Sequence, residues 1–89
     1  MPQAVVDPDD LREFARSLKK FNNDVRDRAR SLSNQLTALG ASWRDQEHRK
    51  FLEQFEQGMK LIGRFLDNND RHVPYLLRKA DHIDEYLQS

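Results

Sequence analysis

The sequence contains no cysteine, so neither a disulfide nor a thiolate metal site can stabilise its 89 residues. An excess of one charge is also missing: 15 Lys and Arg balance 15 Asp and Glu, which argues against a general nucleic-acid or anionic-membrane partner. No stretch approaches the roughly 20 apolar residues of a membrane span, and the N-terminus lacks the charged and then apolar segments of a cleaved signal peptide. We therefore expect one small domain without membrane insertion, cytoplasmic or else secreted without a cleaved signal peptide.

Strand signals are also lacking, because β-branched residues are few and no sustained alternation of apolar and polar residues occurs. Apolar residues instead recur every three or four positions in two long runs, with no internal repeat beyond this pairing. The first run predicts a helix over about residues 8–39, with Asp7 as N-cap, Pro8 at the first helical position and Gly40 as a left-handed stop. The intervening positions are polar, so the opposite side of this helix is expected to face water. Its apolar stripe consists of Leu11, Phe14, Leu18, Phe21, Val25, Ala29, Leu32, Leu36 and Leu39.

The second run predicts a helix over about residues 43–87, after a turn at residues 40–42. Ser42 is suited to cap this helix, with Asp45 three residues further on. Pro74 removes one backbone hydrogen bond, but the apolar phase continues across it, so we favour a helix kinked near Pro74 over a break into a third helix. The second stripe consists of Trp43, Phe51, Phe55, Met59, Ile62, Phe65 and Leu66, followed by Val73, Leu76, Ala80, Ile83 and Leu87.

Two long helices joined by so short a turn must lie antiparallel. The predicted fold class is therefore all-α, a single helical-hairpin domain over residues 1–89. Two helices cover only the facing part of each stripe, and each large apolar side chain left exposed forfeits about 1.5–3 kcal/mol in a domain that has only about 5–15 kcal/mol of stability. We expect dimerisation into a four-helix bundle. A fold-back of the segment after Pro74 is the alternative way to cover the remaining surface.

The turn segment "LGASWRD" contains the only tryptophan, at a place where a loop is ordinarily small and polar. The residues of interest are Gly40, Trp43, Arg44 and Asp45. Trp43 is expected at the first turn of the second helix, where it either closes the open end of the core or forms part of a docking surface, since tryptophan is enriched at binding hot spots. Both roles are compatible with each other.

Two helices with a central "LGASWRD" and a following "HRKFLEQF" resemble the Trp-X-Gly family of small type VII secretion proteins, the early-secretory-antigen-like group, over nearly the whole chain. Trp43 matches the tryptophan and Arg44 the variable residue, whereas Asp45 replaces the glycine. The resemblance implies a homodimer, or a pair with a paralogous protein, in a four-helix bundle. It also implies a secretion ATPase or a toxin as a further partner.

The resemblance has a second point of departure, in the export signal. Actinobacterial members of the family carry a C-terminal Tyr-x-x-x-Asp/Glu signal in the dimer. Here Tyr75 is followed four residues on by Lys79, and Tyr86 lies too close to the end of the chain. If this protein is secreted, its partner or another system is therefore expected to supply the signal.

Ionisable residues do not gather into a catalytic set. Asp45 and His48, and likewise His82 and Glu85, have a helical spacing suited to two metal ligands, but matching inward carboxylates on other helices are missing. The basic stretch 26–31 spreads its arginines around the helix and includes an aspartate, so a solvated face is favoured over a nucleic-acid contact. We therefore expect no enzymatic activity, no cofactor and no metal.

The leading hypothesis is a non-enzymatic helical hairpin that acts through dimerisation, as a type VII secretion-like substrate or as the partner chaperone of one. The alternative is an intracellular coiled-coil adaptor or regulatory module that is not secreted. A metal-dependent, oxidase-like bundle is the enzymatic alternative.

Overall fold

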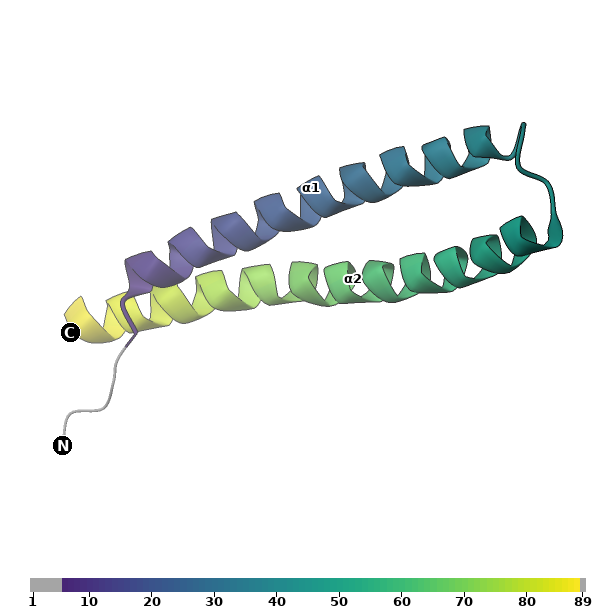
Figure 1. The fold of residues 1–89 in the computed structure, drawn as a ribbon. Helices are drawn as coiled ribbons and strands as arrows, with labels where there is room; N and C mark the ends of the chain where they lie inside the picture. The colour runs from purple at the N-terminus through teal and green to yellow at the C-terminus, as the bar shows by residue number, and fades with distance from the viewer. Residues whose placement is uncertain (1–5, 89) are drawn as a thin grey trace.

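The computed structural model describes residues 6–88, which form two helices, α1 (Pro8–Leu39) and α2 (Gln46–Gln88), with no strand in this range. The helices form an antiparallel hairpin, with the turn at one end and the start of α1 beside the end of α2 at the other, the open end (Figure 1). The radius of gyration is 20.0 Å, whereas a compact domain of this length has about 12 Å. The predicted all-α hairpin is confirmed.

Helix α1 has the boundaries that its capping residues predict. The Asp7 side chain accepts a hydrogen bond of 2.8 Å from the Asp9 amide, and Pro8 occupies the first turn. The expected left-handed stop at Gly40 is wrong, because Gly40 has φ −61° and ψ −14°, in the right-handed region. The chain keeps a helical direction into the turn, where the Trp43 amide donates to the Leu39 carbonyl at 2.9 Å.

Helix α2 begins at Gln46, later than the predicted residue 43, so the connection spans residues 40–45 and not only 40–42. Asp45 is the capping residue: its carboxylate accepts a hydrogen bond of 3.0 Å from the His48 amide. Ser42, the expected cap, instead donates its hydroxyl to the Leu39 carbonyl at 3.4 Å, because the backbone at this point still follows α1. Trp43 therefore lies in the turn and not in the first turn of α2.

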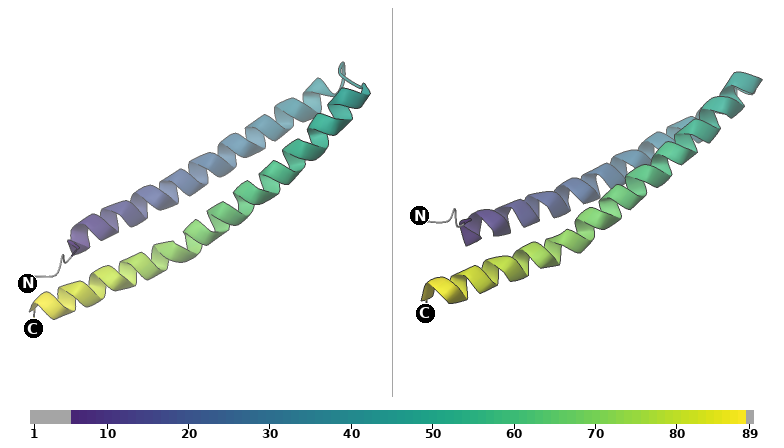
Figure 2. Two further views of the ribbon diagram at one scale, coloured as in Figure 1. Left: turned by 60° about the horizontal axis from the view of Figure 1, so that its bottom comes forward. Right: turned by 90° about the horizontal axis from the view of Figure 1, so that it is seen from below.

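Pro74 lies inside α2, and the helix continues through it to Gln88 without a break. Figure 2 shows that α2 is bowed along its length. Pro74 is exposed, so its ring lies in solvent and its missing N–H removes one bond from the helix without disturbing the packed side. The alternative in which the segment after Pro74 folds back is wrong.

The seam between the helices is narrow. Its buried residues in α1 are Pro8, Ala15, Asn22 and Leu36, which share one heptad position. Their counterparts in α2 are Leu66 and Ala80. Of the predicted stripe, Leu36 and Leu66 are buried, Leu11, Leu18, Val25, Phe55, Met59 and Ile62 are half-buried, and Phe14, Phe21, Leu32, Phe51 and Phe65 are exposed.

Candidate protein-interaction face

One flank of the seam is held by two arginine clamps. Near the open end, the Arg12 guanidinium contacts Asp81 at 2.8 Å and also contacts Asp84, and hydrogen bonding to these two carboxylates raises the pKa of Arg12 above its usual range. Because Arg12 is paired across the helices, its contacts join the start of α1 to the end of α2.

The second clamp repeats the first one two heptads along both helices. Arg26 contacts Asp67 at 3.0 Å and Asp70 at 2.7 Å, and its hydrogen bond lowers the pKa of the Asp70 carboxyl, with a second contribution from Asn22. Each arginine thus bridges two aspartates one helical turn apart. The apolar periodicity did not predict this internal repeat, although the sequence contains it as two Asp-x-x-Asp segments, 67–70 and 81–84. We call this flank the ion-paired face: Arg12, Arg26, Asp67, Asp70, Asp81 and Asp84.

Asn22 connects this face to the seam. It is completely buried, donates to the Asp70 carboxylate at 2.8 Å and accepts from the Asn69 side chain at 3.1 Å. Its hydrogen bonds offset the loss of water. The prediction that the intervening polar residues of the first helix all face water is wrong here, because Asn22 shares the heptad position of Ala15 and Leu36.

The opposite flank is aromatic. Arg12 and Phe14 are two residues apart, which separates them by about 200° around the helix, and Phe65 and Asp67 are related in the same way. Phe21 of α1 and Phe65 of α2 meet edge to face, with ring centroids 6.5 Å apart. All of these phenylalanine rings remain partly exposed. We call this flank the aromatic face: Phe14, Phe21, Leu32, Leu39, Phe51 and Phe65.

Near the turn, the aromatic face contains an apolar hollow of about 250 Å³. Trp43 reaches this hollow through Phe51: its ring centroid lies 6.2 Å from that of Phe51 and 4.8 Å from that of His48, and the Phe51 centroid lies 6.0 Å from that of Phe55. The half-buried Trp43 therefore extends the aromatic face into the turn, and its roles in closing the core and in docking stay predictions. The hollow is lined by Leu32, Gln35, Leu36, Leu39, Phe51 and Phe55.

The remaining turn residues have local roles. Arg44 is exposed and donates through Nε to the Gly40 carbonyl at 3.2 Å. A Cβ added at Gly40 would lie 3.2 Å from the Thr37 carbonyl oxygen, a tight contact, and 3.6 Å from the His48 ring, an ordinary one. Among the residues that the structure describes, the buried Nε2 atom of His48 has no hydrogen-bond partner.

The comparisons with known proteins bear on this arrangement. A family model described as proteins of 100 residues with WXG matches residues 3–86. The chain belongs to the WXG100 family. WXG100 proteins are small helical proteins associated with type VII secretion, and they typically form homodimers or partner pairs. No curated protein and no solved structure matches the chain.

In this WXG100 protein, Asp45 stands at the third position of the motif and supplies the carboxylate that caps α2, a function that glycine has no side chain to perform. Arg26 belongs to a clamp, and Arg30 pairs with Asp27 within α1, so the basic stretch 26–31 is not a continuous patch. Over residues 6–88, no three potential ligands gather around a possible metal site, and neither helix is long and apolar enough to span a membrane.

Proposed function

We propose that this WXG100 protein acts without catalysis as one half of a four-helix bundle. The aromatic face pairs with a second copy or with a related hairpin, and the pair serves as a type VII secretion substrate or as the chaperoning partner of one. The observation that supports this function is the exposure of the aromatic face: Phe14 is 56% and Phe65 55% exposed although both lie beside the seam.

The free energy available from this face is sufficient for pairing. A phenylalanine buries about 150–250 Å² when fully covered, so covering the exposed half of one ring contributes about 2–3 kcal/mol at roughly 25 cal/mol per Å². In a two-fold pair each such residue contributes twice, because both copies present the same surface. Several rings together can therefore offset the loss of translational and rotational freedom on association.

The ion-paired face is not suited to this burial. Its guanidinium and carboxylate groups already satisfy one another across the hairpin, and removing them from water would add a desolvation cost without adding new partners. This contrast orients the bundle, with the aromatic face inward and the ion-paired face outward.

Sedimentation velocity of Phe65→Ser tests this function, with Leu77→Ser as the matched control. Leu77 is also an exposed apolar residue of α2, but it occupies the same heptad position as Asp70 and Asp84 of the ion-paired face. We expect the wild type and Leu77→Ser to sediment as dimers, and Phe65→Ser to dissociate at least about tenfold more readily. In the source organism, Phe65→Ser but not Leu77→Ser should lower the amount of protein in the culture medium.

Two results would contradict the proposal. One is a wild type that stays monomeric at about 100 µM, both alone and mixed with each related hairpin of its own genome. The other is an equal effect of the two substitutions on sedimentation and on secretion.

A further inference from the structure

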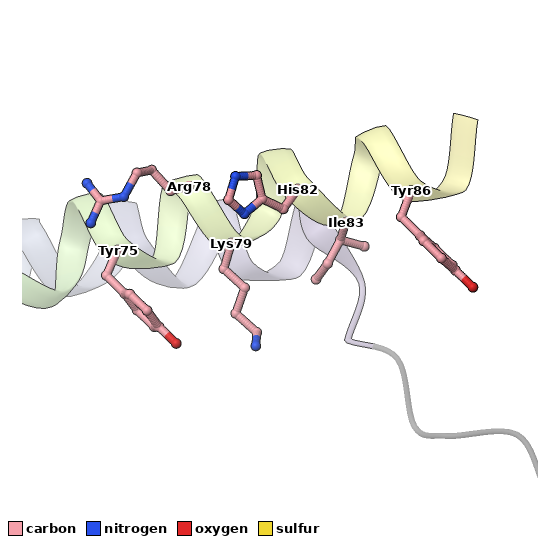
Figure 3. Close-up of a pocket in the computed structure, with 6 residues that line it drawn as sticks. All are labelled: Tyr75, Arg78, Lys79, His82, Ile83 and Tyr86. Atoms are coloured by element: carbon pink, nitrogen blue, oxygen red, sulfur yellow. The ribbon is translucent and has the colours of Figure 1, made fainter. Parts of the chain in front are cut away.

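A second surface lies at the open end of α2, where Lys79 and Tyr86 continue the heptad position of Phe65 beyond the aromatic face. It contains a hollow of about 410 Å³ and is drawn in Figure 3. Tyr75, Lys79 and Tyr86 project toward the same side of the helix (Figure 3). We call this surface the cationic end: Tyr75, Arg78, Lys79, His82, Ile83 and Tyr86.

The charge of this surface results from the clamp on the other side of α2. Asp81 and Asp84, which are close to it in sequence, are held by Arg12 on the ion-paired face. Within residues 6–88, the side chains of Arg78 and Lys79 make no hydrogen bond and no ion pair. A protein with no net charge therefore presents two cations on consecutive residues, both of which border the hollow.

Tyrosine rings border these cations at both ends of the surface. Tyr75 is half exposed and Tyr86 is 80% exposed, so both phenol groups and ring faces are accessible. Tyrosine provides a rigid apolar surface together with a hydrogen-bonding hydroxyl, a combination that is enriched where proteins bind one another. From Tyr75 to Tyr86 the helix rises by about 16 Å, which matches three turns of another helix and exceeds the size of a small anion.

We propose that the cationic end binds an acidic segment of a partner protein other than a second copy of this chain. Carboxylates of that segment pair with Arg78 and Lys79, while its apolar side chains pack against Ile83 and the two tyrosine rings. A second copy is less suited, because its two aspartate pairs on the ion-paired face are already neutralised by its own arginines. Two cations are also too few to bind nucleic acid at physiological salt. The proposal goes beyond pairing through the aromatic face and has its own assay.

The proposal is tested by measuring, through fluorescence anisotropy, the binding of a labelled 20-residue helical peptide. This peptide carries glutamates and leucines along one face. We expect saturable binding that weakens as salt is raised and that Lys79→Glu weakens at least about tenfold. Tyr75→Ala should weaken it about threefold or more, through lost packing. Lys60→Glu, at another exposed lysine of α2, is the matched control and should stay within about twofold of the wild type. Circular dichroism establishes that every variant keeps its helices.

Several outcomes would overturn the proposal: no saturable binding by the wild type, equal binding of a peptide with glutamine in place of glutamate, or equal effects of Lys79→Glu and Lys60→Glu. Tighter binding of a single-stranded oligonucleotide than of the acidic peptide would also overturn it. If Lys79→Glu dissociates the self-pair as strongly as Phe65→Ser, the surface belongs to the self-interface and the proposal is wrong. Retained peptide binding by a monomeric Phe65→Ser would support it, and would show that the two surfaces act separately.

Discussion

At the scale of single residues, the contacts of Trp43 explain why a large aromatic side chain stands at a bend. The turn carries it beside His48 and Phe51, so the ring is only partly in water and packs against Phe51, a residue that lines the apolar hollow. A small polar residue at this place would lack the ring contacts with His48 and Phe51. Tyr86 is the contrasting case, because 80% of it is exposed at the other end of the hairpin.

Trp43→Ala is therefore expected to lower the free energy of unfolding by about 1–3 kcal/mol, less than a fully buried tryptophan would, and to weaken pairing. Tyr86→Ala should change the free energy of unfolding by less than about 0.5 kcal/mol. Urea unfolding followed by circular dichroism, together with sedimentation velocity, measures both effects. Small and equal effects of the two substitutions would count against the role given to Trp43.

At the scale of the helices, the two clamps define the register of the hairpin. If α2 slipped by one heptad toward its C-terminal end, Arg12 would face Pro74 and Leu77, and Arg26 would face Lys60 and Gly63. Both arginines would lose their carboxylate partners on α2, and one would approach a lysine. The aspartate pairs therefore favour the observed register at two levels of the seam, and buried Asn22 adds a third.

The clamps also predict how stability depends on pH. The folded state lowers the pKa of Asp70 below its value in the unfolded chain, mainly through Arg26, so this carboxylate stabilises the fold above the unfolded pKa of about 3.9. That contribution is lost as the pH falls through the lower folded value. The difference in Tm between the wild type and Asp70→Asn should be constant from about pH 7 to 5 and should shrink below about pH 4. Thermal unfolding by circular dichroism measures it, and a difference that does not change down to pH 2.5 would contradict the assignment.

The sequence predicted both helices because each carries a long apolar period, and Asp7 and Pro8 marked the start of α1. It misplaced the start of α2, because Ser42 and Asp45 are both good caps and only the backbone path chooses between them. Apolar periodicity also could not distinguish exposed Phe21 from buried Leu36, because both lie on one predicted stripe and the seam is narrower than that stripe.

The ion-paired face was missed for a different physical reason. Arg26 and Asp70 look like solvated charges when each helix is considered alone, and they become partners only when the hairpin sets the two helices in register. Asn22 was likewise assigned to water because of its polarity, although its heptad position coincides with that of buried Ala15. Interhelical spacing of charges, in addition to the apolar period, is the signal that would have identified these residues.

At the scale of the whole molecule, the hairpin is a rod of 66 × 22 × 17 Å with chemically different flanks. Such a rod has two simple ways to cover an apolar flank. Two hairpins can lie side by side, or two chains can open at the turn and exchange helices along a longer assembly. The hydrogen bonds of residues 40–43 to the end of α1 and the capping of α2 by Asp45 favour the closed hairpin, and thus the lateral pair.

Small-angle X-ray scattering distinguishes the two arrangements. A lateral pair doubles the mass while its largest dimension remains about 70–80 Å, close to that of one hairpin, because the added helices widen the rod without lengthening it. Chains opened at the turn would extend beyond about 110 Å, at about 1.5 Å for each residue of the two helices placed end to end. Phe65→Ser should keep the length of the wild type at half its mass, since it removes the contact between hairpins and leaves the clamps within each one intact. A wild-type particle longer than about 110 Å would show that the turn opens, and the aromatic face would then be covered by helix exchange instead of lateral pairing.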